Sequence, residues 1–382
     1  MPERVLVISN IPTPYNDALY ASFAARPEVE LLVLYGAARE SNRAWRLEAS
    51  KGYPYQVLPG LTLAGSLHLN AGMNRAIRRF APGVAVLTGS YTMPAVQGAA
   101  AALRVRRVPW VYWGEELLHG PAPLLRRMLR DALRRPLRAA RGVLAIGSRA
   151  RESYARAGIP RERIADFRYY ANTEAFALAP AAREAARARV RGQLGLQAGA
   201  AVFLFVGQLI PRKGVDTLLR AAAHAPGATV VVAGNGPEGE RLRALAAELG
   251  VADRVRFAGF VQPAELPGLF AAADAFVLPA HSEGWGVVVP EAMAAGLPVL
   301  ATDRVNAAAD LVADGESGFR FPVHDHAALG ARMEELCARP ERRAAMGRAA
   351  RTAVGGEAPA VAARRLVALL EAARAGAPLA AL

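Results

Sequence analysis

Cysteine is almost absent from this chain of 382 residues, which contains only Cys337. A single cysteine excludes an internal disulfide framework and any metal site built from several thiolates, and it is typical of a cytoplasmic protein. Long apolar runs are missing too, because no stretch approaches the roughly 18 residues of a membrane-spanning helix. The start, Met1–Ser9, leads directly into an apolar strand and lacks the pattern of a signal peptide. We therefore expect a cytoplasmic location.

Lysine is nearly as scarce, since 45 of the 47 basic residues are arginine. The net charge of +14 lies entirely in residues 1–190, which hold 28 basic and 14 acidic residues, whereas residues 191–382 hold 19 of each. Two interpretations stay open: a solvated surface that reflects composition bias, or attraction to an anionic membrane. The arginine clusters at 104–107 and 126–138 lack interleaved aromatic residues, so we expect no nucleic-acid partner.

Short apolar runs alternate with helical segments along the whole chain, which predicts βα units and parallel sheets. The length suits two domains. We place the first at residues 1–178, an Ala- and Arg-rich linker at 179–198, the second at 199–355 and a C-terminal helix in 356–382. Strands are predicted at Val5–Ser9, Leu31–Tyr35, Val84–Thr88, Trp110–Trp113, Val143–Ile146, Ala201–Val206, Thr229–Ala233, Arg254–Ala258, Ala275–Leu278 and Val299–Ala301.

The turn after the first strand contains no glycine. Residues 10–16 read NIPTPYN, so the G-x-G-x-x-G fingerprint of dinucleotide-dependent oxidoreductases and epimerases is missing. This stiff, aromatic loop is either part of an acceptor pocket or a plain connector.

The segment Leu124–Arg138 has an apolar stripe and six arginines, which predicts an amphipathic basic helix, or two short ones broken near Pro136. Such a helix either covers the sheet or lies on a membrane surface, and the two roles are compatible if leucines face inward and arginines face lipid phosphates.

In the second half, the strand Ala201–Val206 runs into Gly207-Gln208-Leu209-Ile210-Pro211-Arg212-Lys213-Gly214 and then a helix. Backbone N–H groups at such a helix start attract phosphate. Lys213 adds a point charge and Arg212 a planar fork. Because lysine is so rare in this chain, its presence beside a glycine at a helix start favours a phosphate-binding role. The turn Gly234-Asn235-Gly236-Pro237 after the next strand lets backbone approach a flat ring closely.

Two carboxylates follow the strand Ala275–Leu278. Glu283 lies in a loop with Gly284, Trp285 and Gly286, and Glu291 lies eight residues later in the first turn of a helix that includes Pro290. Ligands bind beyond the carboxyl ends of parallel strands, and a carboxylate there can accept two hydrogen bonds from a vicinal diol such as a ribose.

This stretch, SEGWGVVVPEAMAAGLPV, resembles the E-x7-E signature of the retaining glycosyltransferases of the GT-B fold, most closely family 4. The resemblance covers nearly the whole chain and is specific between Val206 and Phe321. It implies an α/β fold with two Rossmann-like domains, whose parallel sheets face each other across a central cleft. The first domain would bind the acceptor, the second the nucleotide-sugar donor, and the last helix would cross back to the first.

The resemblance also implies roles for single residues. Glu291 would hold the ribose, Arg212 and Lys213 the diphosphate, and Glu283 with the Gly284–Gly286 backbone the sugar hydroxyls. Gln208 replaces an arginine of the family pattern G-R-L-x-x-x-K-G, a loss that Arg212 compensates. Glu115 takes the place of a histidine that faces the transferred sugar in relatives; a helix-capping role is its alternative. The implied catalytic residues are Glu283, Glu115 and Lys213.

The implied function is hexosyl transfer from a nucleotide-diphosphate sugar, UDP- or GDP-linked, to a hydroxyl of a saccharide or lipid-linked acceptor in cell-surface glycan or glycolipid synthesis. No metal and no further cofactor are expected, because cations can neutralise the leaving group. A peripheral position on the inner face of the plasma membrane stays open. The alternatives are a basic membrane- or nucleic-acid-binding protein without transferase activity, and a GT-B sugar phosphorylase or epimerase.

Overall fold

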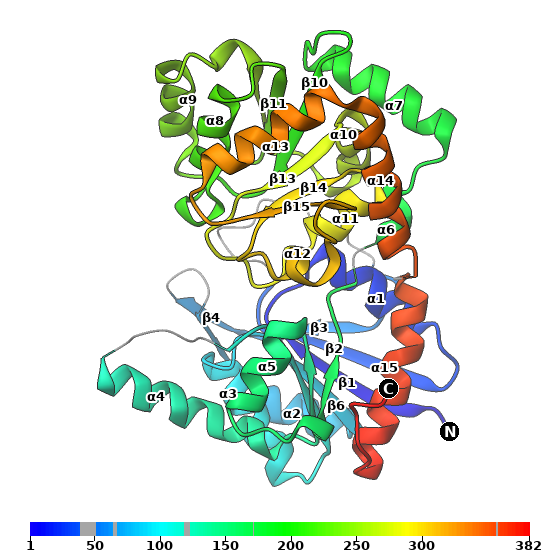
Figure 1. Ribbon diagram of the computed structural model, residues 1–382. Coiled ribbons are helices and arrows are strands. Elements are labelled where there is room, and N and C mark those ends of the chain that lie inside the picture. Colours follow the sequence, from blue (N-terminus) through cyan, green and yellow to red (C-terminus); the bar gives the residue numbers. More distant parts are fainter. Residues whose placement is uncertain (39–50, 64–66, 118–122, 171, 357) are drawn as a thin grey trace. The chain divides into compact units, whose positions relative to one another are not determined.

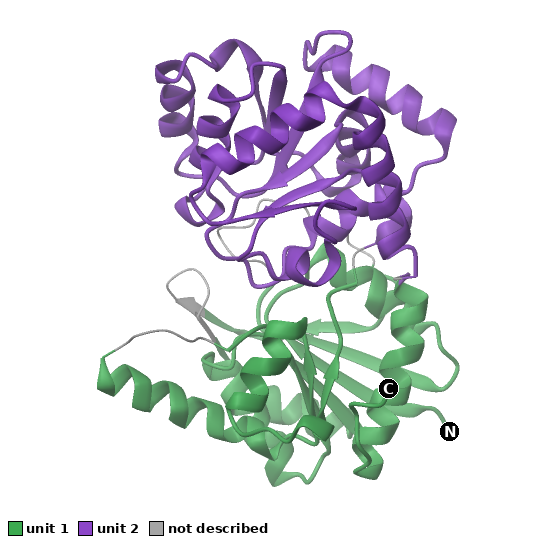
Figure 2. Cartoon of the chain, in the orientation of Figure 1, with its two compact units in different colours: residues 1–170, 359–382 green, residues 171–358 purple. Residues whose placement is uncertain are grey.

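Parallel β-sheets form the centre of both halves of the chain (Figure 1). The computed structural model describes residues 1–38, 51–63, 67–117, 123–170, 172–356 and 358–382. They form two compact units: unit 1 is Met1–Tyr170 with Pro359–Leu382, and unit 2 is Ala171–Ala358 (Figure 2). The chain thus passes between units at two points, close to residues 170 and 358.

The sheet of unit 1 has the strand order β3-β2-β1-β6-β7-β8-β9, and all its neighbours are parallel. Its central strands are buried along their whole length, as expected for a parallel sheet with both faces covered. The strands are β1 (Glu3–Ser9), β2 (Val29–Tyr35), β3 (Tyr55–Val57), β6 (Val84–Thr88), β7 (Trp110–Gly114), β8 (Gly142–Ala145) and β9 (Ile164–Asp166), with a separate antiparallel pair β4 (Gly60–Leu63) and β5 (Leu67–Asn70).

The helices of unit 1 follow the expected alternation with strands. They are α1 (Pro14–Ala24), α2 (Met73–Phe80), α3 (Pro94–Val105), α4 (Leu124–Arg134) with the 3-10 turn η1 (Arg135–Ala139), α5 (Ser148–Arg156), the 3-10 turn η2 (Arg161–Arg163) and α15 (Pro359–Ala375). The change from α4 to η1 after Arg134 supports the second of the two alternatives for this segment, two short helical pieces broken near Pro136. Helix α15 packs on α1 and buries Leu366, Leu369 and Leu370, so the C-terminal segment is part of the core of unit 1.

The sheet of unit 2 has the order β12-β11-β10-β13-β14-β15 and is also parallel throughout. Its strands are β10 (Ala201–Val206), β11 (Ala228–Ala233), β12 (Val255–Gly259), β13 (Ala275–Leu278), β14 (Val299–Thr302) and β15 (Gly318–Phe321). Its helices are α6 (Thr173–Phe176), α7 (Pro180–Gln193), α8 (Val215–Ala223), α9 (Gly239–Glu248), α10 (Leu266–Ala272), α11 (Val288–Ala294), α12 (Asn306–Leu311), α13 (His326–Ala338) and α14 (Pro340–Val354), with 3-10 turns η3 (Pro211–Lys213), η4 (Ala252–Arg254) and η5 (Pro263–Glu265).

The structure differs from the linker expected over residues 179–198. This segment forms α7, which packs against α10 as a full member of unit 2. Arg187 and Arg191 hold it by ion pairs of 2.8 and 2.6 Å to the two oxygens of Asp274, the residue before β13. An Ala- and Arg-rich composition indicated a helix correctly but did not reveal what the arginines bind.

None of the helices in the described part of the chain is long and apolar enough to cross a membrane.

Candidate nucleotide-sugar site

The sheet of unit 2 changes its direction of growth between β10 and β13. From β10 the chain continues through α8 to β11 on one side, whereas β13 lies on the other side of β10. The loops that follow such neighbouring strands diverge and leave a crevice at the carboxyl edge of the sheet, where ligands bind in open α/β folds. The loops after β10, β11 and β13 contain the predicted site residues of unit 2 except Glu291, which lies in α11 directly after the last of these loops.

The loops after β10 and β11 are joined by backbone hydrogen bonds. Gly207 N–H donates to the Ala233 carbonyl at 3.0 Å, and Leu209 N–H donates to the Asn235 carbonyl at 2.8 Å. A Cβ atom on Gly234 would overlap the Gly207 carbonyl oxygen, so only glycine permits this approach. Asn235, Gly236 and Pro237 are exposed beyond this junction, where a flat ring could reach them.

The loop after β13 packs against the start of α8. Gly214 ends η3 with φ +63°, and a Cβ there would overlap the Pro279 carbonyl oxygen. His281 N–H donates to the Arg212 carbonyl at 2.8 Å. The His281 ring lies 4.2 Å from that of His324, and burial, with His324 adding to the effect, lowers the pKa of His281. Nothing in the sequence indicated His324, which lies just after β15 and more than forty residues after His281.

Both predicted phosphate-binding cations meet one carboxylate. Lys213 Nζ forms an ion pair with Glu283 Oε2, and Arg212 Nη1 lies 3.2 Å from the same oxygen. Arg212 also donates to the Ser282 carbonyl at 2.6 Å. The Lys213 and Glu283 side chains are only 12% and 14% exposed, so this is a largely desolvated pair. The structure therefore brings Glu283 into contact with two adjacent residues that lie about seventy positions earlier in the sequence.

The loop that carries Glu283 is fixed by its neighbours. Glu283 N–H donates to the Arg304 carbonyl at 3.1 Å, and the Asn306 side-chain amide donates to the Gly284 carbonyl at 2.8 Å. Gly286 has φ +97°, a conformation that favours glycine. Trp285 is only 1% exposed, so its indole belongs to the core beneath the loop. The ligand contact expected from the backbone of residues 284–286 stays a prediction.

Glu291 lies in the first turn of α11, as expected, although the helix begins two residues before Pro290. Its side chain is half-buried, and burial raises the pKa of the carboxyl to about 8. Among the residues that the structure describes, no hydrogen bond or ion pair reaches this carboxyl. A half-buried carboxyl without a partner suits a ligand that supplies hydroxyl donors.

Two predicted residues differ from the rest in their setting. Gln208 is half-buried and already takes part in interactions within the protein. Glu115 is an exposed residue of unit 1, just after β7, and its backbone carbonyl accepts a hydrogen bond of 2.8 Å from Tyr154 Oη. The structure thus places Glu115 in a different unit from Lys213 and Glu291.

Metal-ligand clusters are lacking across the described ranges, where no three His, Cys, Asp or Glu side chains come together in a suitable way.

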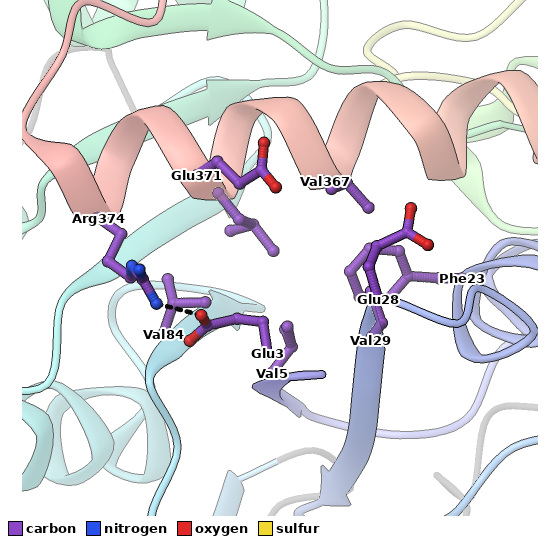
Figure 3. Close-up of a pocket in the computed structure, with 10 residues that line it drawn as sticks. Glu3, Val5, Phe23, Glu28, Val29, Val84, Val367, Glu371 and Arg374 are labelled. Carbon is purple, nitrogen blue, oxygen red and sulfur yellow. Dashed lines mark hydrogen bonds and ion pairs between the residues drawn. The ribbon is translucent and has the colours of Figure 1, made fainter. Parts of the chain in front are cut away.

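A separate pocket in unit 1 lies between α15 and the first residues of β1, β2 and β6 (Figure 3). Its floor is apolar, and Glu3, Glu28 and Glu371 surround it with Arg374, which pairs with Glu3. It contains none of the predicted site residues. It lies at the amino ends of the strands, whereas ligands of open α/β sheets bind beyond the carboxyl ends.

Comparison with solved structures identifies the fold of the whole chain. The Anabaena protein HepE, crystallised with UDP, superposes with a TM-score of 0.78 over 97% of this chain and 100% of its own, at 21% identity. Sucrose-phosphate synthase from Thermosynechococcus elongatus gives 0.77 over 98% and 100%. The fold is the GT-B fold of glycosyltransferases, with two Rossmann-like α/β units.

Sequence comparison points to a particular family within that fold. Residues 186–353, most of unit 2, match the family described as "Glycosyl transferases group 1". A D-inositol 3-phosphate glycosyltransferase of Acidothermus cellulolyticus is 46% identical over 154 residues, which are 37% of this chain and 34% of that protein. The match spans about a third of that relative's length. The similarity of sequence therefore concerns the unit that holds the candidate site.

Proposed function

We propose that the protein is a retaining glycosyltransferase that moves a hexose from a nucleotide-diphosphate sugar to a hydroxyl of a saccharide or lipid-linked acceptor. The observation that carries this proposal is the ion pairing of Arg212 and Lys213, which precede α8, with Glu283 in the loop after β13. The same loop leads to α11 and to Glu291, whose carboxyl has no partner among the described residues. Cations and acids that follow neighbouring strands at the carboxyl edge of one sheet suit a ligand with phosphates at one end and hydroxyls at the other.

The cations are already gathered before a donor binds. In the structure Glu283 pairs with both Lys213 and Arg212, and one carboxylate balances only one of these two positive charges. A diphosphate carries more charge than one carboxylate and would compete for both cations, releasing Glu283 to accept hydrogen bonds from the sugar hydroxyls. Glu283 would thus serve as a placeholder for the diphosphate, and Glu291 would hold the ribose.

The reaction step follows from the same groups. The bond between the anomeric carbon and the diphosphate oxygen breaks, and charge that develops on that oxygen is stabilised by Lys213 and Arg212. The acceptor hydroxyl attacks from the same face and gives its proton to the leaving phosphate oxygen, so that configuration is retained. Glu115, in unit 1, would orient the acceptor or the transferred sugar.

The names of the relatives suggest the kind of acceptor. Besides the inositol phosphate enzyme, a GDP-mannose-dependent mannosyltransferase of Mycolicibacterium smegmatis that acts on phosphatidylinositol monomannoside is 38% identical over 177 residues, or 44% of this chain and 46% of that protein. We extend to this chain only the chemistry that the two names share, a hydroxyl-rich acceptor that contains inositol phosphate. A role in glycan or glycolipid synthesis at the inner face of the plasma membrane is our own proposal.

The test is release of free nucleotide diphosphate from UDP-glucose, UDP-N-acetylglucosamine and GDP-mannose, with and without a panel of hydroxylated acceptors. Turnover of one donor should depend on acceptor, and Lys213→Ala should reduce it roughly hundredfold, the usual loss when a group that stabilises the leaving charge is removed. Arg241→Ala, an exposed change on α9, is the matched control and should leave turnover intact. Equal turnover by Lys213→Ala and the control would reject the proposal.

A further inference from the structure

The first two turns of α4 present large apolar side chains to solvent. Leu124 is 67% exposed, Leu125 78%, Met128 61% and Leu129 59%, and α4 has no buried residue. Spacings of three and four residues put these side chains on one face of the helix. Of the alternatives left open by the sequence, the one in which the leucines face the sheet therefore does not hold for the first half of α4.

Only the C-terminal part of α4 and the following η1 pack against the core of unit 1. Leu133 packs partly against the core of unit 1, the Leu133 carbonyl accepts a hydrogen bond of 2.8 Å from Gln97, and Leu137 in η1 is buried. Leu125, Leu129 and Leu133 form one row on α4 at intervals of four, and Leu137 follows in η1. The row thus starts beyond the core and ends inside it, and the N-terminal end of α4 extends away from the rest of unit 1 (Figure 1).

Exposed arginines interrupt the exposed stripe, and the sequence around it is strongly basic. Arg126 and Arg127 are exposed on α4 itself. Exposed arginines 104, 106 and 107 lie at the end of α3, which contacts η1 next to α4, and Val105 among them is 84% exposed. Over residues 71–141 the sequence has 13 arginines and three acidic residues. An apolar face flanked by arginines suits a surface that offers hydrocarbon below a layer of phosphate.

We propose that α4 docks the protein onto an anionic lipid bilayer, with Leu124, Leu125, Met128 and Leu129 inserted at the boundary of headgroups and acyl chains. Arg126 and Arg127 would bind lipid phosphates. A second copy of the chain fits less well, because it would bring two strongly positive surfaces together. A peptide partner fits less well too, because the four apolar side chains are exposed on the surface of a single helix, whereas peptides usually bind in grooves or along sheet edges. The inference does not depend on the proposed donor chemistry.

The first test is cosedimentation of the full chain with two kinds of vesicle. One is phosphatidylcholine alone, and the other contains about 30% of the anionic lipid phosphatidylglycerol. Binding should rise with anionic lipid and fall with salt. The variant Leu125→Ser/Met128→Ser/Leu129→Ser should bind anionic vesicles at least about tenfold more weakly, because insertion of apolar side chains supplies much of the affinity. Arg126→Gln and Arg127→Gln should each cost about fivefold, from roughly 1 kcal/mol per charge near the surface.

The matched control is Val361→Ser, which removes a 40%-exposed apolar side chain from α15 and should bind as the wild type does. All these positions are exposed, so the variants should keep the melting temperature of the wild type. Wild-type binding by the triple variant, or equal binding to neutral and anionic vesicles, would overturn the proposal. A wild-type dimer in sedimentation equilibrium that the triple variant abolishes, without vesicle binding, would assign the stripe to a second copy instead.

A second readout locates the contact directly. The chain has one cysteine, so Met128→Cys in a Cys337→Ser background accepts a single environment-sensitive fluorophore. Anionic vesicles should shift its emission to the blue and make it accessible to lipid-borne quenchers. The same label at exposed Glu248 in unit 2 is the control and should not respond. An unresponsive label at position 128 on vesicle-bound protein would show that another surface binds the lipid.

Discussion

Single residues of the candidate site show how burial sets their chemistry, and Glu291 is the clearest case. The pKa of its carboxyl is about 8 in the folded protein against an ordinary value of 4.5. Between these values the folded protein holds a proton that the unfolded chain has released, so Glu291 lowers stability as pH rises through this window. We expect Glu291→Gln to melt above the wild type at pH 8 and to converge with it near pH 5. A difference in melting temperature that is the same at both pH values would contradict this.

Gly214 permits the close packing of the β13 loop on α8. With φ +63° and the Pro279 carbonyl at the position of a Cβ, Gly214→Ala should lower the free energy of unfolding by about 1–3 kcal/mol. Gly192→Ala in α7, where nothing lies within 4 Å of an added Cβ, is the control and should be neutral or stabilising by roughly 0.5–1 kcal/mol. Urea unfolding measures both, and equal effects would show that the conformation of residue 214 is not constrained.

The sequence predicted single residues well where composition or motif isolated them. Lys213 stood out because only one other lysine exists, and Glu291 because of its spacing from Glu283. The ion pair of Lys213 with Glu283 was not predictable, because it depends on the order of strands in the sheet. Trp285 lies between two glycines in a motif loop, and nothing in that pattern distinguishes a ligand contact from a core residue.

At the scale of elements, α7 is held by a compact set of charges. Arg187 and Arg191 donate to both oxygens of Asp274 and to carbonyls at the end of α10. Asp274→Ala would leave two half-buried guanidinium groups without their anion and should cost about 3–5 kcal/mol of unfolding free energy. Asp131→Ala, which removes an exposed partner of Arg134, should cost roughly 0.5 kcal/mol. Similar costs for both variants would show that the pairs of Asp274 contribute no more than a surface ion pair.

All ten strands predicted from apolar runs are present, with ends that differ by up to two residues. The sequence did not reveal β3, β9 and β15, three short strands at sheet edges, or the β4–β5 pair. Edge strands are exposed on one side and carry little continuous apolar pattern, so β3 with three exposed residues resembles a loop. The α4 helix was predicted correctly, but which way its leucines point depends on where the core ends.

At the scale of the whole molecule, the C-terminal segment completes unit 1. Leu379 is fully buried against Gly142 of β8, and its N–H donates to the Glu162 carbonyl at 2.7 Å. Leu379→Ala should lower the free energy of unfolding by about 2–5 kcal/mol, as expected for a core leucine. Leu382→Ala, at a 46%-exposed position three residues on, should change it by less than about 0.5 kcal/mol. Chemical denaturation of both variants checks this, and an unaffected Leu379→Ala would mean that the tail is not part of the cooperative unit.

The central claim is that unit 2 binds the nucleotide end of a donor through its cations, and a thermal-shift titration with UDP, GDP and ADP tests it most directly. A ligand at a hundred times its Kd stabilises the folded state by about 2.7 kcal/mol, which raises the melting temperature by several degrees. We predict such a shift for one of the three nucleotides in the wild type and its loss in Lys213→Ala. No shift with any nucleotide, or the same shift in both proteins, would contradict the account.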